Sequence, residues 1–262
     1  MVKISVVTPS VRLEGLETVK QSLARQTFRE FEWIIVCPPQ MAEQLNPSHH
    51  SHQKARMLDN KTMVVIEPPK NPEDTYALNR AWNEGFRHAS GELIVSFLDM
   101  TWAPPDALQN FWYHYQDNPK SLVGGVGHQY EKVQNGKPEV LIWKDPRMRT
   151  DYGSFYEINP IDLEFCLTSV PKKAIYDIGG WDEKWDKYAA LSEKEACLRM
   201  DKLGYKFYLD QSIEYRALTH PRLTKNWEER YQAGCKYMDK CFREINAGTR
   251  LKLNYLDKSS KT

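Results

Sequence analysis

Four short apolar segments, with helical segments between them, constrain the fold of this chain more than any other feature of its sequence. Each segment is rich in Val, Ile or Leu, and each ends at or just before a proline, an aspartate or a polar turn. Short apolar runs of this kind are typical of strands that are buried on both faces of a sheet. Because strands that alternate with helices form parallel sheets with crossover helices, we expect a parallel sheet. The four predicted strands are residues 3–8, 31–36, 63–66 and 93–98.

The rest of the chain supplies the helices and a second group of strands. Apolar residues at helical spacing predict five helices, at residues 13–26, 73–89, 102–115, 192–203 and 227–245. Further strands are predicted at residues 122–126, 206–209 and 213–216, with a hairpin turn at Asn135-Gly136. A polar tail, residues 253–262, is expected to be frayed.

The sequence shows no repeat and no change in composition that would mark a linker, so we expect one compact domain. It comprises residues 1–225, divided into a nucleotide-binding half, residues 1–101, and an acceptor half, residues 102–225. Residues 226–262 are expected to form a C-terminal helix and tail.

Charge and hydropathy narrow the classes of function. The chain has 36 Lys and Arg residues and 35 Asp and Glu residues, so its overall field does not attract nucleic acid or an anionic membrane. A local basic patch would still permit a nucleic-acid acceptor. The sequence contains no apolar run of about 18 residues, so no transmembrane segment is predicted. The five cysteines lack CxxC spacing, which favours reduced thiols and a cytoplasmic protein.

The carboxyl ends of the predicted parallel strands are the expected binding region. Ligands bind beyond this edge in such sheets, and Pro9-Ser10, Cys37-Pro38 and Asp99 would lie together there. Asp99 directly follows a buried strand. A carboxylate at that point can hold a divalent cation against a diphosphate or accept a hydrogen bond from a ribose hydroxyl. The alternative role for Asp99 is an N-cap of the following helix, and the strand pattern alone does not decide between them.

Several motifs occur in an order and at a spacing that are typical of one family. Asn83-Glu84-Gly85 is followed by Ala89-Ser90-Gly91-Glu92 and then by a strand that ends in Leu98-Asp99. This arrangement resembles the core of the family 2 glycosyltransferases, which have the GT-A fold. Other segments are similar to the first two strands of that family, to its Gly-Gly-Phe-Asp-Glu loop and to its acidic helix. These segments are residues 4–10, 23–36, 179–183 and 192–199.

The resemblance implies an α/β fold of the GT-A, or nucleotide-diphospho-sugar transferase, type. Such a fold has a mostly parallel central sheet flanked by helices, here with a C-terminal helical extension. The resemblance also implies transfer of a sugar, with inversion, from a nucleotide-sugar donor to a hydroxyl of a glycan or another acceptor. In this reaction the leaving diphosphate gains negative charge and the acceptor hydroxyl loses its proton. A cation is therefore expected beside the diphosphate and a carboxylate beside the acceptor.

The resemblance also assigns roles to individual residues. Glu193 takes the place of the catalytic base at the start of the acidic helix, where the helix dipole favours an ionised carboxylate. Glu195 and Asp182 are the other predicted catalytic residues. Asp99 and His220 are predicted to bind a divalent cation, Mn²⁺ or Mg²⁺. The predicted donor-binding residues are Thr8, Pro9, Ser10, Asn83, Asp99, Thr101 and Trp181.

The chain departs from the family pattern at two places. The second strand of the family ends in Asp-Asp-Gly-Ser, whose first Asp reads the base, whereas this chain has Cys37-Pro38-Pro39-Gln40. Recognition of the base must therefore differ. Thr101 stands where the family has a second metal-binding carboxylate, which weakens the predicted cation site. Arg80 is not at the position of the family's arginine, which is Trp82 here, so no role is carried over to Arg80.

Other functions stay open on the sequence alone. A relative that binds sugar nucleotides or glycans without turnover is favoured by the missing carboxylate and opposed by the retained Glu193 and Glu195. A nucleotidyltransferase would need a glycine-rich phosphate loop after the first strand, but residues 9–12 contain no glycine. An anionic acceptor, such as a modified nucleic acid, would require scattered basic residues to come together. These residues are Arg147, Arg149, Lys172, Lys173, Lys258 and Lys261.

Overall fold

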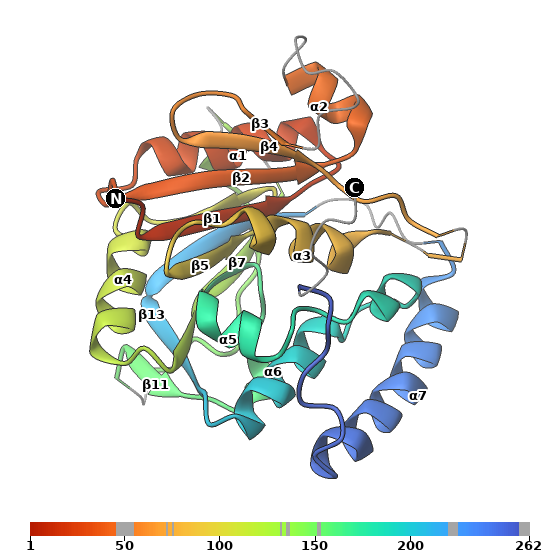
Figure 1. Cartoon of the computed structure of the whole chain (residues 1–262). Coiled ribbons are helices and arrows are strands. Elements are labelled where there is room, and N and C mark those ends of the chain that lie inside the picture. Colours follow the sequence, from red (N-terminus) through yellow and green to blue (C-terminus); the bar gives the residue numbers. More distant parts are fainter. Residues whose placement is uncertain are drawn as a thin grey trace.

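One large sheet, covered by helices on both faces, forms the centre of the fold (Figure 1). The structure is a computed structural model, and it describes residues 1–45, 55–71, 73, 74, 76–131, 133, 134, 137–150, 153–219 and 225–256. In these residues the sheet contains 11 strands, and β8 (Val133–Gln134) pairs with β9 (Lys137–Pro138) in a separate hairpin. This pairing agrees with the predicted hairpin, although Asn135-Gly136 lies outside the described residues. The chain is therefore an α/β protein.

The four strands predicted from the apolar runs form the N-terminal part of the sheet. They are β1 (Ile4–Pro9), β2 (Phe31–Cys37), β4 (Thr62–Ile66) and β5 (Leu93–Phe97). These strands are parallel and lie in the order β4-β2-β1-β5. Alternate side chains of a strand point to opposite faces, so each apolar run supplies residues to both layers of the core.

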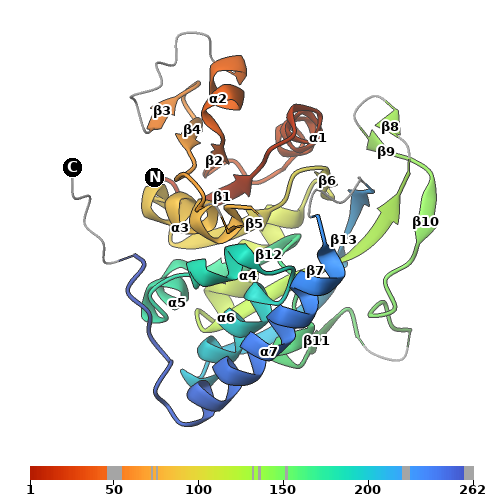
Figure 2. The same ribbon diagram turned by 90° about the vertical axis from the view of Figure 1, so that its right-hand side faces the viewer.

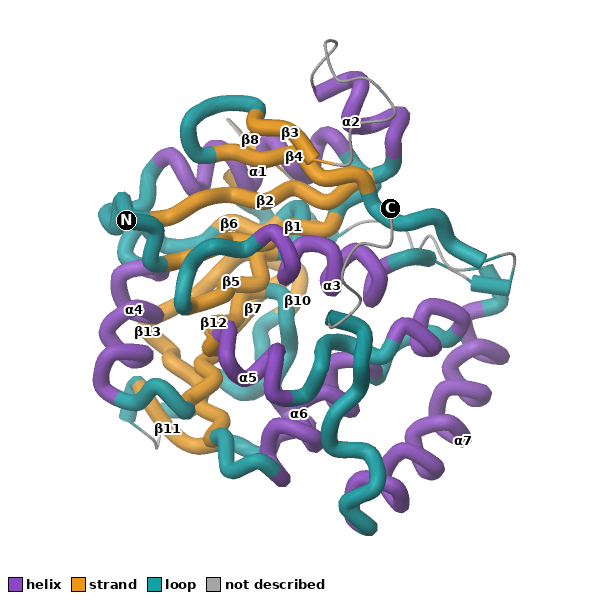
Figure 3. Tube along the Cα trace, in the orientation of Figure 1, coloured by secondary structure: helices purple, strands orange, loops and turns teal. Residues whose placement is uncertain are grey.

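Helices form a layer on each face of the sheet, as Figure 2 and Figure 3 show from two sides. The first layer consists of α1 (Leu13–Ala24) and α4 (Ala107–Asp117). The second consists of α3 (Leu78–His88), α5 (Lys172–Asp177) and α6 (Ser192–Lys202). In the described part of the chain, no helix combines the length and the apolar character needed to cross a membrane.

The sheet is mixed, so the prediction of a mostly parallel sheet is wrong. Next to β5 lies β12 (Leu167–Pro171), which runs antiparallel to both β5 and β7 (Ser121–Tyr130). The long strand β13 (Lys206–Leu218) then pairs in parallel with β7. Antiparallel neighbours need no crossover helix, so this part of the chain does not show the strand and helix alternation of the first part. The other antiparallel strands are β3 (Ala55–Met57), β6 (Thr101–Trp102), β10 (Leu141–Trp143) and β11 (Phe155–Glu157).

Several elements begin or end at positions other than those predicted. The helix predicted at residues 102–115 begins at Ala107, because Trp102 belongs to β6 and pairs with β13. The helix predicted at residues 73–89 begins at Leu78. The two short strands predicted after α6 are one strand, β13, whose pairing with β7 changes register near its middle. The elements that were not predicted include α2 (Pro39–Leu45), α5, β3, β11 and β12.

The segment after α7 (Trp227–Asn246) lies against the domain, so the expectation of a frayed tail is wrong as far as Leu256. The backbone N–H of Leu253 donates to Ile178 O at 2.8 Å, next to the C-terminal end of α5. Gly179 has a φ of 70°, and a Cβ there would lie 1.4 Å from Leu253 O, so only glycine permits this approach. Residues 257–262 are outside the described residues.

Candidate functional site

The carboxyl edge of the parallel strands contains the point at which the strand order reverses. From β1 the chain continues to β2 and then to β4 on one side, whereas β5 pairs with the other side of β1. In sheets of this kind, ligands bind in the crevice between the carboxyl ends of the strands that flank the reversal. The residues that follow β1 and β5 therefore define the candidate site.

Ser10 and Asp99 meet at this point, where the sequence had placed both of them. Ser10 follows β1, and its Oγ donates to Oδ2 of Asp99 at 2.8 Å. The guanidinium of Arg12 lies 3.4 Å from the same oxygen, and the Arg12 side chain is 15% exposed. Arg12 was not among the predicted site residues, and its position shortly after the first strand was its one signal in the sequence.

The backbone around Asp99 is closely packed and strained. A Cβ on Gly15 of α1 would lie 2.9 Å from Cβ of Asp99, so the approach of α1 to this turn needs a glycine. Met100 has a φ of 65°, a left-handed conformation that is unfavourable for a residue with a long side chain. Strain of this kind persists where the surrounding structure determines the backbone, and it clusters at ligand sites. The turn after β5 therefore has the character of a binding site.

The described residues do not fit the predicted divalent cation. In the part of the chain that the structure describes, no three His, Cys, Asp or Glu side chains are grouped to hold a metal ion. Asp99 already contacts a guanidinium, Thr101 is 1% exposed in β6, and His220 lies outside the described residues. An arginine at the N-terminus of α1, held by a carboxylate, suits the negative charge of a phosphate instead.

Most of the other predicted donor-binding residues are buried and hold the fold together. Thr8 is fully buried and its Oγ1 accepts from Trp33 Nε1 at 2.9 Å, while Pro9 is buried at the end of β1. Asn83 of α3 forms two hydrogen bonds with the backbone of Trp181, at 2.8 and 2.9 Å. Trp181 is 1% exposed within the core. The side chains of Thr8 and Asn83 are thus engaged within the protein.

Asp182 is also buried, and its two oxygens are fully engaged. It accepts hydrogen bonds from Tyr237 Oη at 2.5 Å and from Tyr255 Oη at 2.8 Å, and it forms an ion pair with Arg250. Burial acts to raise the pKa of Asp182, but the hydrogen bonds that it accepts and the charge of Arg250 together lower the pKa. Asp182 therefore joins its loop to the C-terminal segment and has no free oxygen for catalysis.

Glu195 has a comparable structural role on α6. It is fully buried and is bound by Arg199 at 2.9 and 3.0 Å and by Nε of Arg250 at 2.9 Å. Arg199 in turn donates to the backbone oxygens of Ile178 and Gly180, at 2.7 and 3.0 Å. These contacts fix the start of α6 against the loop that carries Asp182.

Glu193 is the third predicted catalytic acid, and its surroundings differ from those of the other two. It lies half-buried in the first turn of α6, and Ser192 Oγ donates to its Oε2 at 3.0 Å. The two residues before this turn, Ala190 and Leu191, both have left-handed backbones, with φ of 60° and 71°. Left-handed conformations at two successive residues that are not glycine are costly, which marks this turn as a candidate functional element.

The charge of Glu193 reaches residues that border the carboxyl edge. Burial raises the pKa of the Tyr76 hydroxyl and of the Cys166 thiol, and the negative charge of Glu193 raises both further. Cys166 O accepts from Leu98 N at 3.0 Å, directly beside Asp99. Glu193 thus acts on Cys166, a residue that is hydrogen-bonded beside Asp99. Tyr76, which follows β4 and precedes α3, is a neighbour of the site that the sequence did not indicate.

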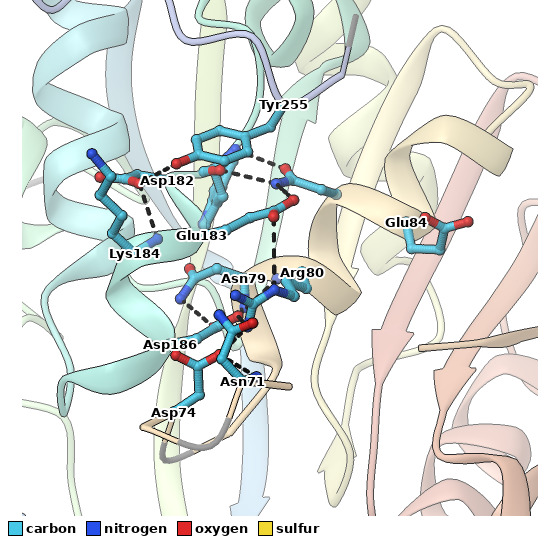
Figure 4. Close-up of polar contacts among 12 residues, drawn as sticks. Asn71, Asp74, Asn79, Arg80, Glu84, Asp182, Glu183, Lys184, Asp186 and Tyr255 are labelled. Atoms are coloured by element: carbon cyan, nitrogen blue, oxygen red, sulfur yellow. Dashed lines mark hydrogen bonds and ion pairs between the residues drawn. The ribbon is translucent and has the colours of Figure 1, made fainter. Parts of the chain in front are cut away.

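A network of charged residues surrounds the N-terminus of α3 (Figure 4). Asp186 accepts from the backbone N–H groups of Asn79 and Arg80, at 2.7 and 3.3 Å, and thus caps α3 from 107 residues away. Arg80 also pairs with Asp74 and lies 3.7 Å from Glu183. Because a protein carboxylate already satisfies this helix N-terminus, it is not available to a phosphate.

A further carboxylate at the edge, Glu67, was missed by the sequence analysis. Glu67 directly follows β4, and its backbone N–H donates to Cys37 O at 2.9 Å. Burial, together with the nearby charge of Asp186, raises the pKa of Glu67 to about 7. A carboxyl group that titrates near neutral pH at a ligand-binding edge is a candidate for contact with the donor. Its signal in the sequence was its position at the end of a predicted strand.

Of the basic residues considered for an anionic acceptor, three of those that the structure describes have partners within the protein. Arg147 is bound by acidic neighbours, Lys173 pairs with the acid four residues later on α5, and Lys172 Nζ donates to a backbone oxygen at 2.6 Å. Lys258 and Lys261 lie outside the described residues.

Comparison with known proteins leaves this site to be interpreted from its geometry. No protein-family model matches the chain, and no curated protein matches it.

Proposed function

We propose that this chain is a glycosyltransferase that moves a sugar from a nucleotide-diphosphate sugar to an acceptor hydroxyl, with Glu193 as the general base. One observation carries the proposal. Of the three acids predicted to be catalytic, Asp182 and Glu195 are buried and bound by arginines, whereas Glu193 is half-buried on a strained turn beside the carboxyl edge. A general base needs access to the proton that it removes, and Glu193 has that access.

Arg12 and Asp99 act on the donor in this proposal. Negative charge builds on the diphosphate as the glycosidic bond breaks, and a guanidinium held in a mostly buried position stabilises that charge without having to move. Asp99 and Ser10 orient Arg12. The acceptor oxygen attacks the anomeric carbon on the face opposite the diphosphate, the bond to the diphosphate breaks, and Glu193 accepts the hydroxyl proton. The configuration at the anomeric carbon is thereby inverted.

A GT-A fold is part of the same proposal. It is supported by a parallel half, β4-β2-β1-β5, that ends in the predicted donor site, followed by a mixed half that carries Glu193 on α6. The order of the sequence motifs along these elements is the order expected for family 2. The proposal does not depend on the predicted metal, because the described residues favour Arg12 as the cation beside the diphosphate. The effect of metal is tested in the experiment below.

Donor binding is tested by the melting temperature of the protein in the presence of UDP-, GDP-, CDP- and dTDP-sugars, with and without Mg²⁺ or Mn²⁺. A ligand that binds only the folded state raises the melting temperature. We expect one nucleotide to give a shift that does not require metal and that is lost in Arg12→Ala. If no nucleotide shifts the melting temperature under any condition, the donor site is wrongly assigned.

Catalysis is tested by the release of nucleoside diphosphate from the donor that binds. Glu193→Gln should keep the ligand-induced shift and slow the release at least about 100-fold, because a general base contributes roughly 10²–10⁴ in rate. Glu229→Gln changes an exposed acid in the first turn of α7 and is the matched control. Equal rates for Glu193→Gln and the wild type would remove Glu193 from the mechanism.

A relative that binds the donor without turnover is the second candidate. The arginine contact to Asp99 and the hydroxyl of Thr101 in place of a carboxylate favour it. This candidate predicts that the wild-type protein shows a ligand-induced shift but releases no nucleoside diphosphate.

A further inference from the structure

The acceptor half contains a cavity of about 500 Å³ that the roles proposed above do not use. It lies between the end of β10 and the segments that carry β11, η1 (Pro160–Asp162) and the start of α6. Its volume is within the range of small-molecule sites, roughly 300–1,000 Å³. The lining includes Trp143, Arg147, Arg149, Tyr156, Asp162 and Lys194.

The cavity opens beside the proposed base. Lys194 directly follows Glu193, lines the cavity, and donates from Nζ to Ile161 O at 3.0 Å. Glu164 also lines the cavity, and both Glu164 and Glu193 add to the effect of burial in raising the pKa of the Cys166 thiol. Both carboxylates thus act on Cys166, and Glu193 is the residue next to Lys194 in the cavity wall.

Trp143 gives the cavity an exposed aromatic surface. It is the last residue of β10, an edge strand that pairs with β7, and it is 44% exposed. The ring of Tyr156 also lines the cavity, and the guanidinium of Arg149 lies 5.9 Å from its centre. An indole that presents an apolar face at the border of a polar cavity suits a ligand that has both apolar and polar faces, as a sugar ring does.

The charges of the lining do not favour an ionic ligand. Arg147 binds Asp145 through Nε at 2.9 and 3.1 Å and lies 3.2 Å from Glu164, so its charge is compensated. The remaining cations, Arg149 and Lys194, share the lining with two further acids, Glu157 and Asp162. A cavity with nearly balanced acids and bases attracts neither a polyanion nor a polycation, whereas sugar hydroxyls can donate to its carboxylates and accept from its cations.

We propose that this cavity is the acceptor subsite and that it takes an uncharged oligosaccharide, with Trp143 as the surface on which a sugar ring stacks. The inference deepens the proposed function, on which it rests for the identity of Glu193 as the base of the attacking hydroxyl. The cavity itself binds the oligosaccharide whether or not donor is present.

The test is direct binding, measured by ligand-observed NMR with the full chain and no donor. The uncharged probes are cello-, malto- and chitotetraose, and tetragalacturonate is the charged probe. We expect at least one uncharged probe to bind and Trp143→Ala to weaken that binding about tenfold, the loss of one stacking contact. Trp143→Phe should retain an intermediate affinity. Phe242→Ala removes an exposed aromatic ring on α7, far along the chain from the cavity, and should bind like the wild type.

Three results would overturn the inference: no binding of any uncharged probe, a preference for tetragalacturonate, or equal binding by Trp143→Ala and the wild type. Glu193→Gln separates this inference from the proposed function, because it should bind the oligosaccharide normally. Oligosaccharide binding that depends on Trp143, without nucleoside diphosphate release by the wild type, would refute the transferase and leave the saccharide site standing.

Discussion

Arg250 links the C-terminal segment to two buried carboxylates, and replacing it tests how the candidate site is held. It donates from Nε to Oε1 of Glu195 at 2.9 Å and forms an ion pair with Asp182. The side chains of these two acids are 0% and 1% exposed. The change to make is Arg250→Met, which retains an apolar stem of similar length and removes the charge.

The expected loss of stability follows from the contacts that remain. Removing one partner of a buried ion pair costs about 3–5 kcal/mol, because an uncompensated charge stays buried. Glu195 keeps Arg199 at 2.9 and 3.0 Å, and Asp182 keeps the hydroxyls of two tyrosines. We therefore expect Arg250→Met to lower the unfolding free energy by about 3 kcal/mol, the lower end of this range. For a chain of this size, that corresponds to a fall in melting temperature of about 6–12 °C.

Calorimetry at pH 7 and in acid measures the loss of unfolding free energy in Arg250→Met. Lys20→Met is the matched control, because Lys20 pairs with Glu17 at 3.7 Å on the surface and should cost less than about 0.5 kcal/mol. Burial acts to raise the pKa of Asp182, but its hydrogen bonds and the charge of Arg250 together hold the pKa below its ordinary value of 3.8. The stabilisation by Arg250 is thus present above that value and is lost as the pH falls through the lowered pKa. A loss under about 1 kcal/mol at pH 7 would refute the reasoning, since buried pairs cost more to break.

Three further changes test other parts of the structure. Burial raises the pKa of Glu67 to about 7, so wild-type stability falls as the pH rises from the unfolded value of 4.5 to that value. Glu67→Gln should therefore stabilise the protein by about 1–2 kcal/mol at pH 8, allowing for partial exposure, and have no effect at pH 4. A calorimetric gain that is the same at both pH values would contradict this. Ala190→Gly relieves a φ of 60° at an exposed residue and should add about 1 kcal/mol to the unfolding free energy while it slows nucleoside diphosphate release. A faster release would show that the strain does not position Glu193. Gly85→Ala places a Cβ 2.4 Å from Cγ1 of Val7 and should cost about 1–3 kcal/mol in denaturant unfolding, so an unchanged midpoint would be evidence against that close approach.

The parallel part of the sheet could be predicted because its determinants are local. Each strand is a short apolar run that fills both layers of the core, and the helix between two strands has its own apolar spacing. The position of Ser10 and Asp99 then follows from the rule that parallel strands end at the same edge. Strand β12 has no such signature, because its sequence, Leu-Thr-Ser-Val-Pro, mixes polar and apolar residues although all five are buried. Its polar side chains are satisfied by neighbouring backbone, for example Ser169 Oγ donating to Val123 O at 3.3 Å.

The roles of the predicted site residues depended on partners that are distant in the sequence. The hydroxyls and the guanidinium that engage Asp182 come from 55 to 73 residues further along the chain. Nothing within the loop that carries Asp182 indicates that its carboxylate is buried. The same holds for Asp186. Its role as a helix cap depends on a backbone N–H of α3, 107 residues away in the sequence. A pattern of acids can therefore be found in sequence, but which acid stays accessible is decided by tertiary contacts.

In the proposed mechanism, the buried acids hold the accessible acid, Glu193, in place. An ion pair with arginine opposes protonation of a carboxylate, so a general base must be held in place by groups other than its own oxygens. In this chain Glu195 and Asp182 form the ion pairs, and Arg199 ties α6 to the backbone of the preceding loop. The turn that carries Glu193 is thus fixed from both ends, which is the condition under which a strained backbone at Leu191 can persist. Asp182 and Glu195 are thus positioning residues in the proposed mechanism, so Asp182→Asn should lower stability and slow transfer together, whereas Glu193→Gln should slow transfer alone.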